Sequence, residues 1–222
     1  MLILKVLVGS RAHGLAGPES DYDYRGVYVE PTSRLLSLGQ KPPLSTWLES
    51  GVAPAGGKQD DTSWEVGHFL ALATHCNPTI LELFRAPVSE STDDGLEMRA
   101  LLDHLWHPIG VRDAFIGYGL NQRKKMLDGK DVRPAKYAST YLRVLYQAHE
   151  LLRTGLLLVD MRETPVFHAL VKWRGGDFTP GEVVDVCGDW ERRIRQMAED
   201  HPQRQNLEPI NAYLLTLRRR CW

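Results

Sequence analysis

Hydrophobic residues in the first third of the chain occur in short runs that glycine and proline interrupt. Residues 2–8 form one such run, and its length and its content of Leu, Val and Ile are typical of a buried strand. A second strand is expected over residues 21–29, with glycine and proline between the two runs supplying the connecting turn. Residues 38–59 keep no sustained period, which predicts a long loop with a short strand near Trp47.

Helical spacing replaces these short runs after residue 62. The first apolar stripe repeats at i, i+3, i+4 and i+7 and consists of Val66, Phe69, Leu70 and Ala73. Asn77 and Pro78 interrupt the stripe, and they are expected to be the N-cap and the first residue of a new helix. Further helices are expected at residues 101–105, 109–127, 142–155 and 210–217, and from Asp189 as N-cap after a polar interruption at residues 172–181.

The order of these elements predicts an α+β protein. A small mixed sheet opens the chain and a run of helices follows it, with a boundary near residue 88. We therefore expect an N-terminal sheet domain over residues 1–88 and a helical domain over residues 89–222. A chain of 222 residues, 43% of them hydrophobic, is long enough for one good core or two small ones.

Charge and cysteine content narrow the class of protein. The formal net charge is -1 with 25% charged residues, so no global basic field favours nucleic-acid binding, although a local basic patch is compatible with it. Cys76, Cys187 and Cys221 show no CxxC spacing, which predicts free thiols in a reducing compartment. The run at residues 2–8 is too short for a signal sequence or a membrane span, and no later stretch approaches the length of a span. We expect a cytoplasmic protein with no membrane partner.

Two motifs near the N-terminus carry candidate chemistry. Gly9-Ser10 follows the first apolar run, where a glycine backbone can approach a phosphate closely, and Arg11 adds positive charge. Asp21 and Asp23 have one residue between them, so in a strand both side chains project to the same face. Two carboxylates on one face can share a divalent cation such as Mg²⁺, whose coordination shell a nucleotide phosphate and water would complete.

Each motif alone is common in proteins without any catalytic role. A Gly-Ser pair is usually only a turn, and Asp-x-Asp is usually a solvated strand end or a helix cap. The two motifs in sequence are more specific, because an apolar run ends at Gly-Ser, a spacer of ten residues follows, and Asp-x-Asp enters a second predicted strand. This combination predicts a phosphate-binding turn that faces a pair of metal-binding carboxylates.

The combined pattern resembles the signature of the DNA-polymerase-beta-like nucleotidyltransferase superfamily. It is carried by Val-Gly-Ser-Arg-Ala-His-Gly at residues 8–14 and Ser-Asp-Tyr-Asp-Tyr-Arg-Gly-Val at residues 20–27. Glu-Val-x-x-Phe at residues 65–69 and Asn-Pro-x-x-Leu-Glu at residues 77–82 extend the resemblance to a predicted nucleotidyltransferase branch of bacteria and phages. Some members of that branch are associated with RNA repair. The resemblance covers residues 3–85.

The resemblance implies a metal-dependent nucleotidyltransferase with a third carboxylate on a neighbouring strand. Asp60 and Asp61 are the candidates, just before a helix expected to begin near Trp64, and the spacing to Glu65 favours Asp60. Three carboxylates would hold two Mg²⁺ or Mn²⁺ ions, one beside the attacking hydroxyl and one on the triphosphate. The implied reaction transfers a nucleoside monophosphate from an NTP, for which we expect ATP, and releases pyrophosphate. The acceptor is a hydroxyl on an RNA or tRNA end, a protein or a small molecule.

Other charged residues have two interpretations each. Lys136 and Arg143 lie seven residues apart on one predicted helix, where they would either bind a triphosphate or form a solvated face. Residues 136–155 are similar to a helix of the branch named above. Arg25 can pair with the two aspartates, which we favour, or reach a phosphate. His13 is the histidine that the motif places near the chemistry.

Two other classes of function stay open. A nucleotide-binding regulatory module of the same fold would bind NTP without transferring it. A structural partner of an RNA-repair enzyme would bind another protein through its helical half. The intact Gly-Ser and Asp-x-Asp motifs favour the enzyme over both.

Overall fold

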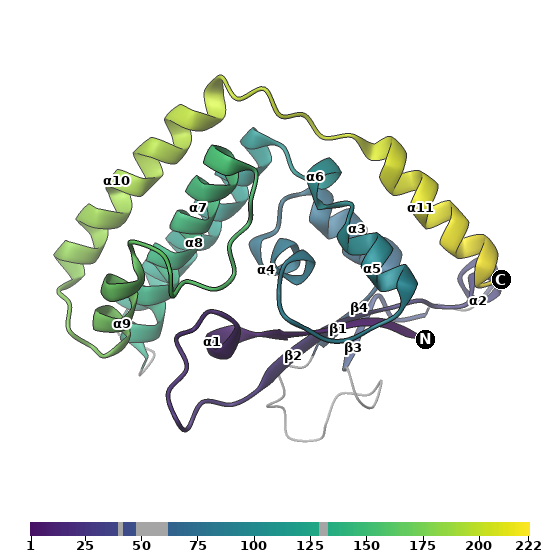
Figure 1. Cartoon of the computed structure of the whole chain (residues 1–222), viewed down its shortest axis with the longest axis horizontal. Helices are drawn as coiled ribbons and strands as arrows, with labels where there is room; N and C mark the ends of the chain where they lie inside the picture. The colour runs from purple at the N-terminus through teal and green to yellow at the C-terminus, as the bar shows by residue number, and fades with distance from the viewer. Residues whose placement is uncertain (40–41, 48–61, 129–132) are drawn as a thin grey trace.

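A five-stranded mixed sheet forms the base of the part of the chain that the computed structural model describes, residues 1–39, 42–47, 62–128 and 133–222 (Figure 1). Its strands are β1 (Leu2–Val8), β2 (Asp23–Tyr28), β3 (Ser45–Trp47), β4 (Thr62–Glu65) and β5 (Val88–Ser91). The strand order is β3-β4-β2-β1-β5, with β2 parallel to β4 and the other neighbouring pairs antiparallel. The apolar β1 is thus an interior strand, and the short strand expected near Trp47 is β3.

Two boundaries around the sheet differ from the sequence prediction. The strand expected over residues 21–29 begins at Asp23, so Asp21 lies before β2 and takes no part in its alternation of faces. The helix expected to begin near Trp64 begins at Val66, because Trp64 lies in β4. Every second residue of β4 is buried, which is the period of two that a strand imposes.

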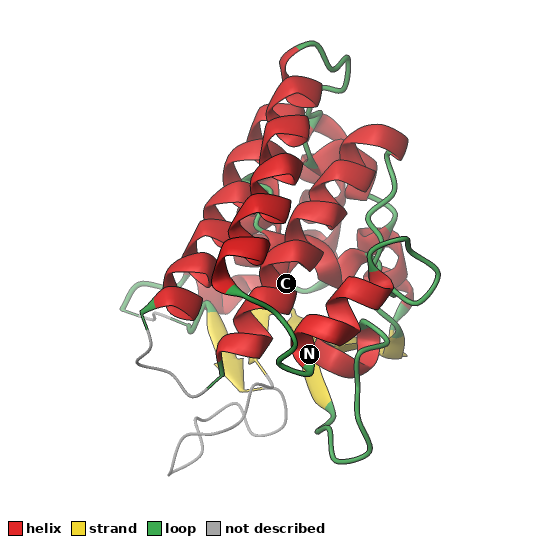
Figure 2. Cartoon of the chain, turned by 90° about the vertical axis from the view of Figure 1, so that its left-hand side faces the viewer, coloured by secondary structure: helices red, strands yellow, loops and turns green. Residues whose placement is uncertain are grey.

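Helices lie on one side of the sheet, as Figure 2 shows, and those of the sheet half are short. Asn77 caps one of them as the sequence predicts, because its side-chain oxygen accepts a hydrogen bond from the Thr79 N–H at 3.0 Å and Pro78 follows it. The predicted stripe at residues 66–73 faces inward with its four members buried. The helices of this half are α1 (Gly9–Ala12), α2 (Thr32–Leu36), α3 (Val66–Thr74), α4 (Pro78–Leu81), the 3₁₀ helix η1 (Glu82–Phe84), α5 (Asp93–Arg99) and α6 (Leu102–Leu105).

A bundle of mostly longer helices stands beside these elements (Figure 1). It consists of α7 (Pro108–Leu127), α8 (Pro134–Thr154), α9 (Phe167–Arg174) and α10 (Pro180–Glu199). α7 and α8 approach closely at Gly119, where an added Cβ atom would lie 2.8 Å from the Tyr141 ring. Gly155 ends α8 in the left-handed conformation with φ 74°, as the sequence predicts.

The start of α10 corrects the sequence prediction. Thr179, and not Asp189, is the N-cap of this helix. The Thr179 hydroxyl accepts a hydrogen bond from the Glu182 N–H at 3.2 Å, and the Glu182 carboxylate accepts one from the Thr179 N–H at 3.4 Å. This reciprocal capping box starts the helix ten residues earlier than expected. The polar interruption expected at residues 172–181 is correspondingly shorter, since α9 reaches Arg174.

The last helix, α11 (Leu207–Arg220), returns to the sheet half and packs against α3 and α6 (Figure 1). Arg218 Nη1 lies 2.7 Å from the buried Glu65 carboxylate of β4. Residue 88, the expected boundary, is the first residue of β5, which pairs with β1. These contacts group β5 and α11 with the sheet, while the division into domains 1–88 and 89–222 stays a prediction.

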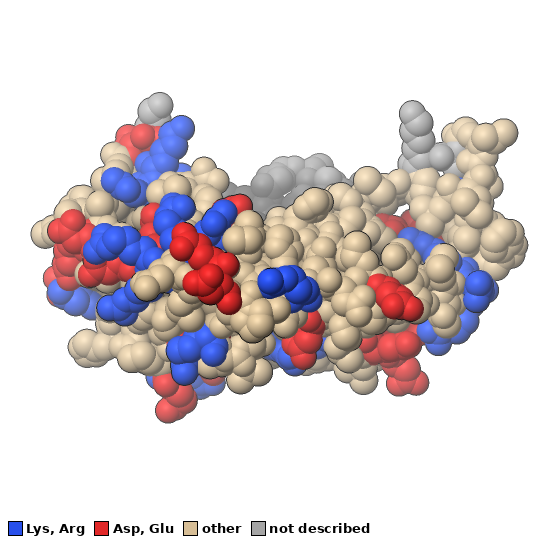
Figure 3. All heavy atoms as spheres, turned by 90° about the horizontal axis from the view of Figure 1, so that it is seen from above, with Lys and Arg blue, Asp and Glu red and all other residues tan. Residues whose placement is uncertain are grey.

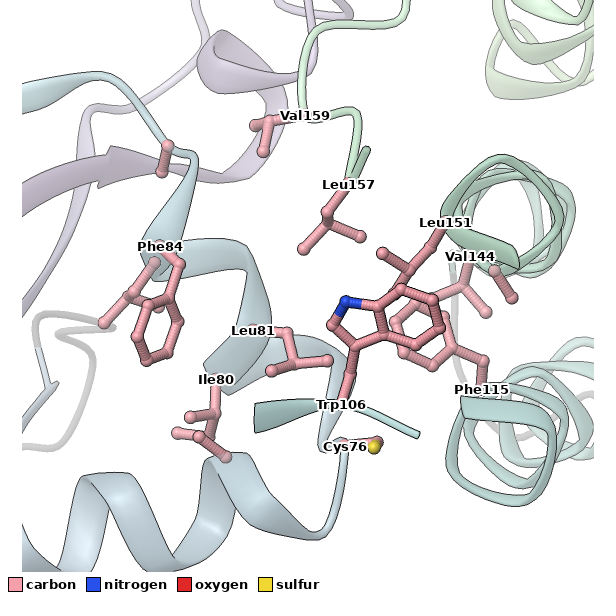
Figure 4. Close-up of a cluster of buried hydrophobic side chains, with 14 of the residues drawn as sticks. Cys76, Ile80, Leu81, Phe84, Trp106, Phe115, Val144, Leu151, Leu157 and Val159 are labelled. Carbon is pink, nitrogen blue, oxygen red and sulfur yellow. The ribbon is translucent and has the colours of Figure 1, made fainter. Parts of the chain in front are cut away.

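A continuous hydrophobic core joins the sheet half to the bundle. Trp106, which is 3% exposed, lies where the two meet. In Figure 4 its ring lies between Leu81 of α4 and Leu151 of α8, with Leu157 from the loop after α8 beside them. The two halves therefore share one interior.

Charged side chains of both signs share the surface. Seen from above in Figure 3, Lys and Arg side chains are interspersed with Asp and Glu, in keeping with the net charge of -1. Cys76, Cys187 and Cys221 are all free thiols, as the sequence predicts. Within the described residues, no helix is both long enough and apolar enough to span a membrane.

Candidate functional site

The end of β1, the start of β2 and the helical bundle enclose an open pocket of about 200 Å³. Three parts of the chain line it: the turn after β1 with the first residues of β2, the segment of α4 and η1, and the facing residues of α7, α8 and α9. The pocket therefore unites the N-terminal motifs with helix residues more than a hundred positions later. Besides Gly9, its lining includes the polar and aromatic residues Ser10, His13, Asp23, Arg25, Glu82, Tyr118, Gln122, Lys136, Arg143 and Arg174.

Gly9 leaves room for the Asp23 carboxylate beside the turn after β1. Its φ of 70° is a left-handed backbone conformation that glycine adopts at no steric cost. An added Cβ atom on Gly9 would overlap Asp23 Oδ2. Val8 pairs with Asp23 across the β1–β2 ladder, which holds the two motifs together. The Gly-Ser turn and the second aspartate thus lie side by side in one wall of the pocket.

Asp21 and Arg11 do not line the pocket. Asp21 is an exposed residue before β2. Arg11 donates hydrogen bonds from Nε and Nη2 to the Ser20 carbonyl at 3.1 and 2.7 Å. The Arg11 guanidinium also lies 3.8 Å from the centroid of the Tyr22 ring, a cation–π contact. The contacts of Arg11 therefore fix the loop between the two motifs.

The predicted third carboxylate, Asp60, and its alternative, Asp61, lie outside the described residues. Within the described residues, no group of three or more His, Cys, Asp and Glu side chains is arranged to hold a metal ion. β4 begins at Thr62 and is parallel to β2, with Ser63 paired to Gly26. The two strands consequently begin at the same end of the sheet. The third carboxylate stays a prediction.

Positive side chains from the bundle line the pocket. Lys136 and Arg143 both do so from α8. Arg143 is only 9% exposed, and its Nη1 donates a hydrogen bond to the Gln147 side-chain oxygen at 2.9 Å. Arg174 joins them from the end of α9, and burial together with the charge of Arg143 lowers its pKa. This concentration of cations suits a polyanionic ligand such as a triphosphate.

Arg25 adds a further positive charge from β2. The pairing of Arg25 with the two aspartates, which the sequence favours, stays a prediction. Four cationic side chains, two from α8 and one each from β2 and α9, therefore line the pocket against the carboxylates of Asp23 and Glu82.

A buried pair of His13 and Glu82 completes the lining. His13 Nε2 lies 2.9 Å from Glu82 Oε1, and the two residues are 5% and 7% exposed. Burial lowers the pKa of His13, as do the charges of Arg143 and Arg25, and together these effects outweigh Glu82, which raises that pKa. Burial alone would raise the pKa of Glu82, but His13, Arg143 and Arg25 outweigh burial and hold that pKa at about 2. At neutral pH the pair therefore combines a neutral imidazole with an ionised carboxylate.

The N-terminal motifs do not identify several of the lining residues. Glu82 carries a local signal, because it ends the Asn-Pro-x-x-Leu-Glu segment at residues 77–82. Gln122 occupies a buried position of α7 in line with Phe115 and other core residues. A polar residue among the apolar positions of one helix face is a sequence feature that could have identified Gln122. Arg174 has no comparable signal, because an arginine at a helix end is ordinary.

One protein family and one protein of Bacillus subtilis are similar to this chain. Residues 1–171 match the family described as RlaP: RNA repair pathway DNA polymerase beta family. The match includes both N-terminal motifs, α7 and α8, and ends before α10. The chain is also 27% identical over 138 residues to the uncharacterized protein YcgL of Bacillus subtilis (strain 168). That alignment covers 61% of this chain and 51% of YcgL, so the chain spans about half the length of this relative.

Proposed function

The chain belongs to the RNA repair pathway DNA polymerase beta family, and from this premise we propose that it transfers a nucleoside monophosphate from an NTP to a hydroxyl acceptor. Pyrophosphate is the second product of this reaction. The family lies within the polymerase-beta-like nucleotidyltransferases. Its description favours an RNA or tRNA end as the acceptor, with a protein or a small molecule as the alternatives.

One juxtaposition supports this proposal. The Gly9-Ser10 turn and the Asp23 carboxylate line the same pocket as Lys136 and Arg143. Phosphate oxygens accept hydrogen bonds from guanidinium and ammonium groups, so in this proposal α8 binds the triphosphate tail. Gly9, which has no side chain, lets that tail approach Asp23. Catalysis then consists mainly of positioning and of neutralising charge during an in-line displacement.

The described carboxylates fit a Mg²⁺ or Mn²⁺ site in part. Asp23 lines the pocket and Asp21 lies two residues before it, and carboxylate oxygens are the hard ligands that these ions prefer. In this proposal Asp60 completes the set. When bound, the metal would polarise the attacking hydroxyl and neutralise charge on the triphosphate. Lys136 and Arg143 balance the charge that develops on the leaving pyrophosphate.

Labelled transfer tests the proposal directly. The protein would be incubated with NTPs labelled in the α-phosphate, with Mg²⁺ or Mn²⁺, and with RNA, tRNA or protein acceptors. Asp23→Asn should lower the transfer rate by about a hundredfold or more, since a charged group of the site is lost. Asp185→Asn is the matched control, because Asp185 is exposed on α10 and lies outside the pocket. Comparing Asp60→Asn with Asp61→Asn would identify the third carboxylate.

Two outcomes would change the proposal. Transfer that survives the double replacement of Asp21 and Asp23 by Asn would contradict the carboxylate mechanism. NTP binding by calorimetry without labelled product on any acceptor would favour a nucleotide-binding regulatory or partner module of the same fold.

A further inference from the structure

Arg174 reaches the pocket from the end of α9, a helix that packs against α8 (Figure 1). The Ser139 hydroxyl of α8 donates a hydrogen bond to the Leu170 carbonyl of α9 at 3.2 Å, and both groups are buried. Trp173, the residue before Arg174, belongs to the hydrophobic core. The half-buried Arg174 side chain therefore extends from a backbone that buried contacts hold beside the pocket.

Arg143 and Arg174 are two like charges held near each other, one from α8 and one from α9. Burial lowers the pKa of Arg174 and the charge of Arg143 lowers it further, whereas a neighbouring carboxylate would raise it. Arg143 itself donates a hydrogen bond to the neutral Gln147 oxygen, and the Gln147 amide donates one to the Leu158 carbonyl at 2.7 Å. Two neighbouring guanidinium groups repel each other, and a bound anion relieves that repulsion. Their position thus indicates an anionic ligand that both contact.

The action of these charges on one another gives their order across the pocket. Arg143 lowers the pKa of the buried Glu82 and of His13, which follows the Gly-Ser turn at the end of α1. Among the described residues, the charge that acts on the pKa of Arg174 is that of Arg143. Because such effects weaken with distance, Arg143 lies between Arg174 and the wall that contains Asp23. Arg174 is the end of this row of charges.

A nucleoside triphosphate matches this order. In the proposed function the α-phosphate reacts beside Asp23 and the Gly-Ser turn. The β- and γ-phosphates then extend toward the bundle and end beside Arg143 and Arg174. The terminal phosphate is the one of the three that can carry a second negative charge, and guanidinium groups suit such an anion because they donate several hydrogen bonds in a fixed plane.

We infer that Arg174 binds the terminal phosphate together with Arg143 and thereby selects nucleoside triphosphates over diphosphates, an inference that rests on the proposed function. A diphosphate whose α-phosphate lies beside Asp23 is one phosphate too short to reach Arg174. Arg174 also lies beyond residues 1–171, which match the family, so membership of that family does not imply this role.

Two non-transferable nucleotides that differ by one phosphate test this inference. Calorimetry in the presence of Mg²⁺ would compare αβ-methylene ATP with αβ-methylene ADP on the wild type, Arg174→Gln and Arg174→Lys. The wild type should bind the triphosphate analogue about ten- to a hundredfold more tightly, the usual effect of a hydrogen bond to a charged group. Arg174→Gln should lose most of this preference through weaker triphosphate binding, and Arg174→Lys should keep part of it.

Two controls accompany these variants. The affinity of Arg174→Gln for the diphosphate analogue should equal that of the wild type, which would show that the variant is folded. Lys172→Gln removes the same charge from the same helix and should behave as the wild type. Lys172 is exposed, lies outside the residues that line the pocket, and has its Nζ 3.4 Å from Glu182 Oε1.

The outcomes separate this inference from the proposed function. Equal affinities of the wild type for the two analogues, or a preference that Arg174→Gln retains, would overturn the role of Arg174 and leave the proposed function intact. An equal loss of both affinities in Arg174→Gln would also contradict it, because Arg174 would then not act on the terminal phosphate alone. If the preference depends on Arg174 but no NTP gives labelled product, the terminal-phosphate site stands and the proposed function fails.

Discussion

Protonation of His13 is opposed by burial and by the charges of two arginine side chains. The imidazole is buried beside Glu82, and the charges of Arg143 and Arg25 act against a proton on the ring. Glu82 and Asp160 favour that proton, but burial and the guanidinium groups outweigh them in the pKa of His13. The positive charge that suits the pocket to an anion therefore comes from the arginine side chains, while His13 stays neutral.

The lowered pKa of His13 predicts a pH-dependent stability. Because the folded pKa lies below the usual 6.5, the unfolded chain takes up a proton on this residue at a higher pH than the folded chain does. Stability should therefore fall as the pH drops below about 6.5, by up to about 1.4 kcal/mol per pH unit. Urea unfolding of wild type and His13→Gln at pH 7.5 and 5.5 measures the difference, which should be a smaller loss in the variant.

A control separates this effect from the other histidines. His168 is exposed on α9, so His168→Gln should lose stability with pH as the wild type does. The pKa of Glu82, about 2, places the loss of its contribution between about pH 4.5 and 2, below the window measured. Identical pH slopes for wild type and His13→Gln would show that burial does not depress the His13 pKa.

At the scale of elements, α11 is held to the sheet half by a buried ion pair. The Glu65 side chain is 3% exposed and contacts two helices. Its carboxylate accepts a hydrogen bond from the Gly67 N–H at the start of α3, and it lies 2.7 Å from Arg218 Nη1 of α11. Arg218 Nη1 also lies 3.4 Å from the Glu30 carbonyl. The basic end of α11 therefore contributes to packing.

Arg218→Ala should destabilise the protein by about 3 kcal/mol. The variant leaves the Glu65 carboxylate buried without its partner, and an uncompensated buried charge costs about this much. Arg219→Ala is the matched control, because Arg219 is the exposed neighbour on α11. Denaturant unfolding compares the two, and equal stabilities would mean that the ion pair contributes nothing to the docking of α11.

At the scale of the whole molecule, the pocket depends on how the bundle meets the sheet. Its walls come from both halves, so a change in their relative position would separate Lys136 and Arg143 from Asp23. The shared core around Trp106 opposes such a change, because it buries side chains of both halves together (Figure 4). The hydrophobic effect and close packing thus position the pocket.

Trp106→Ala should lower the free energy of unfolding by about 3–5 kcal/mol, through lost burial and the cavity left behind. The wild type should unfold in one transition when followed by circular dichroism and by tryptophan fluorescence, since both halves share the core. Trp222→Ala serves as the control, because Trp222 is 77% exposed. Two separate transitions in the wild type would contradict a continuous core and favour independent domains at residues 1–88 and 89–222.

Local sequence patterns predict the features whose cause lies within a few residues. The apolar run of β1, the Asn77 cap and the Gly155 end of α8 all occur as expected, since each depends on neighbouring residues. The prediction failed at α10, where Asp189 has the chemistry of a cap but Thr179 provides the capping box. The capping box is also a local pattern, but it lies in a stretch whose glycines indicate a break between helices.

The sequence by itself determined the class of fold and the two motifs at the N-terminus, because strand and helix periods and a glycine before an aspartate pair are local properties. The tertiary structure decided that Asp23 lines the pocket while Asp21 does not, and that Arg174 and Gln122 join Lys136 and Arg143 there. These residues meet only when α7, α8 and α9 bury their apolar faces against one another and against the sheet half. Contacts between distant parts of the chain depend on that packing, and no short stretch of sequence contains it.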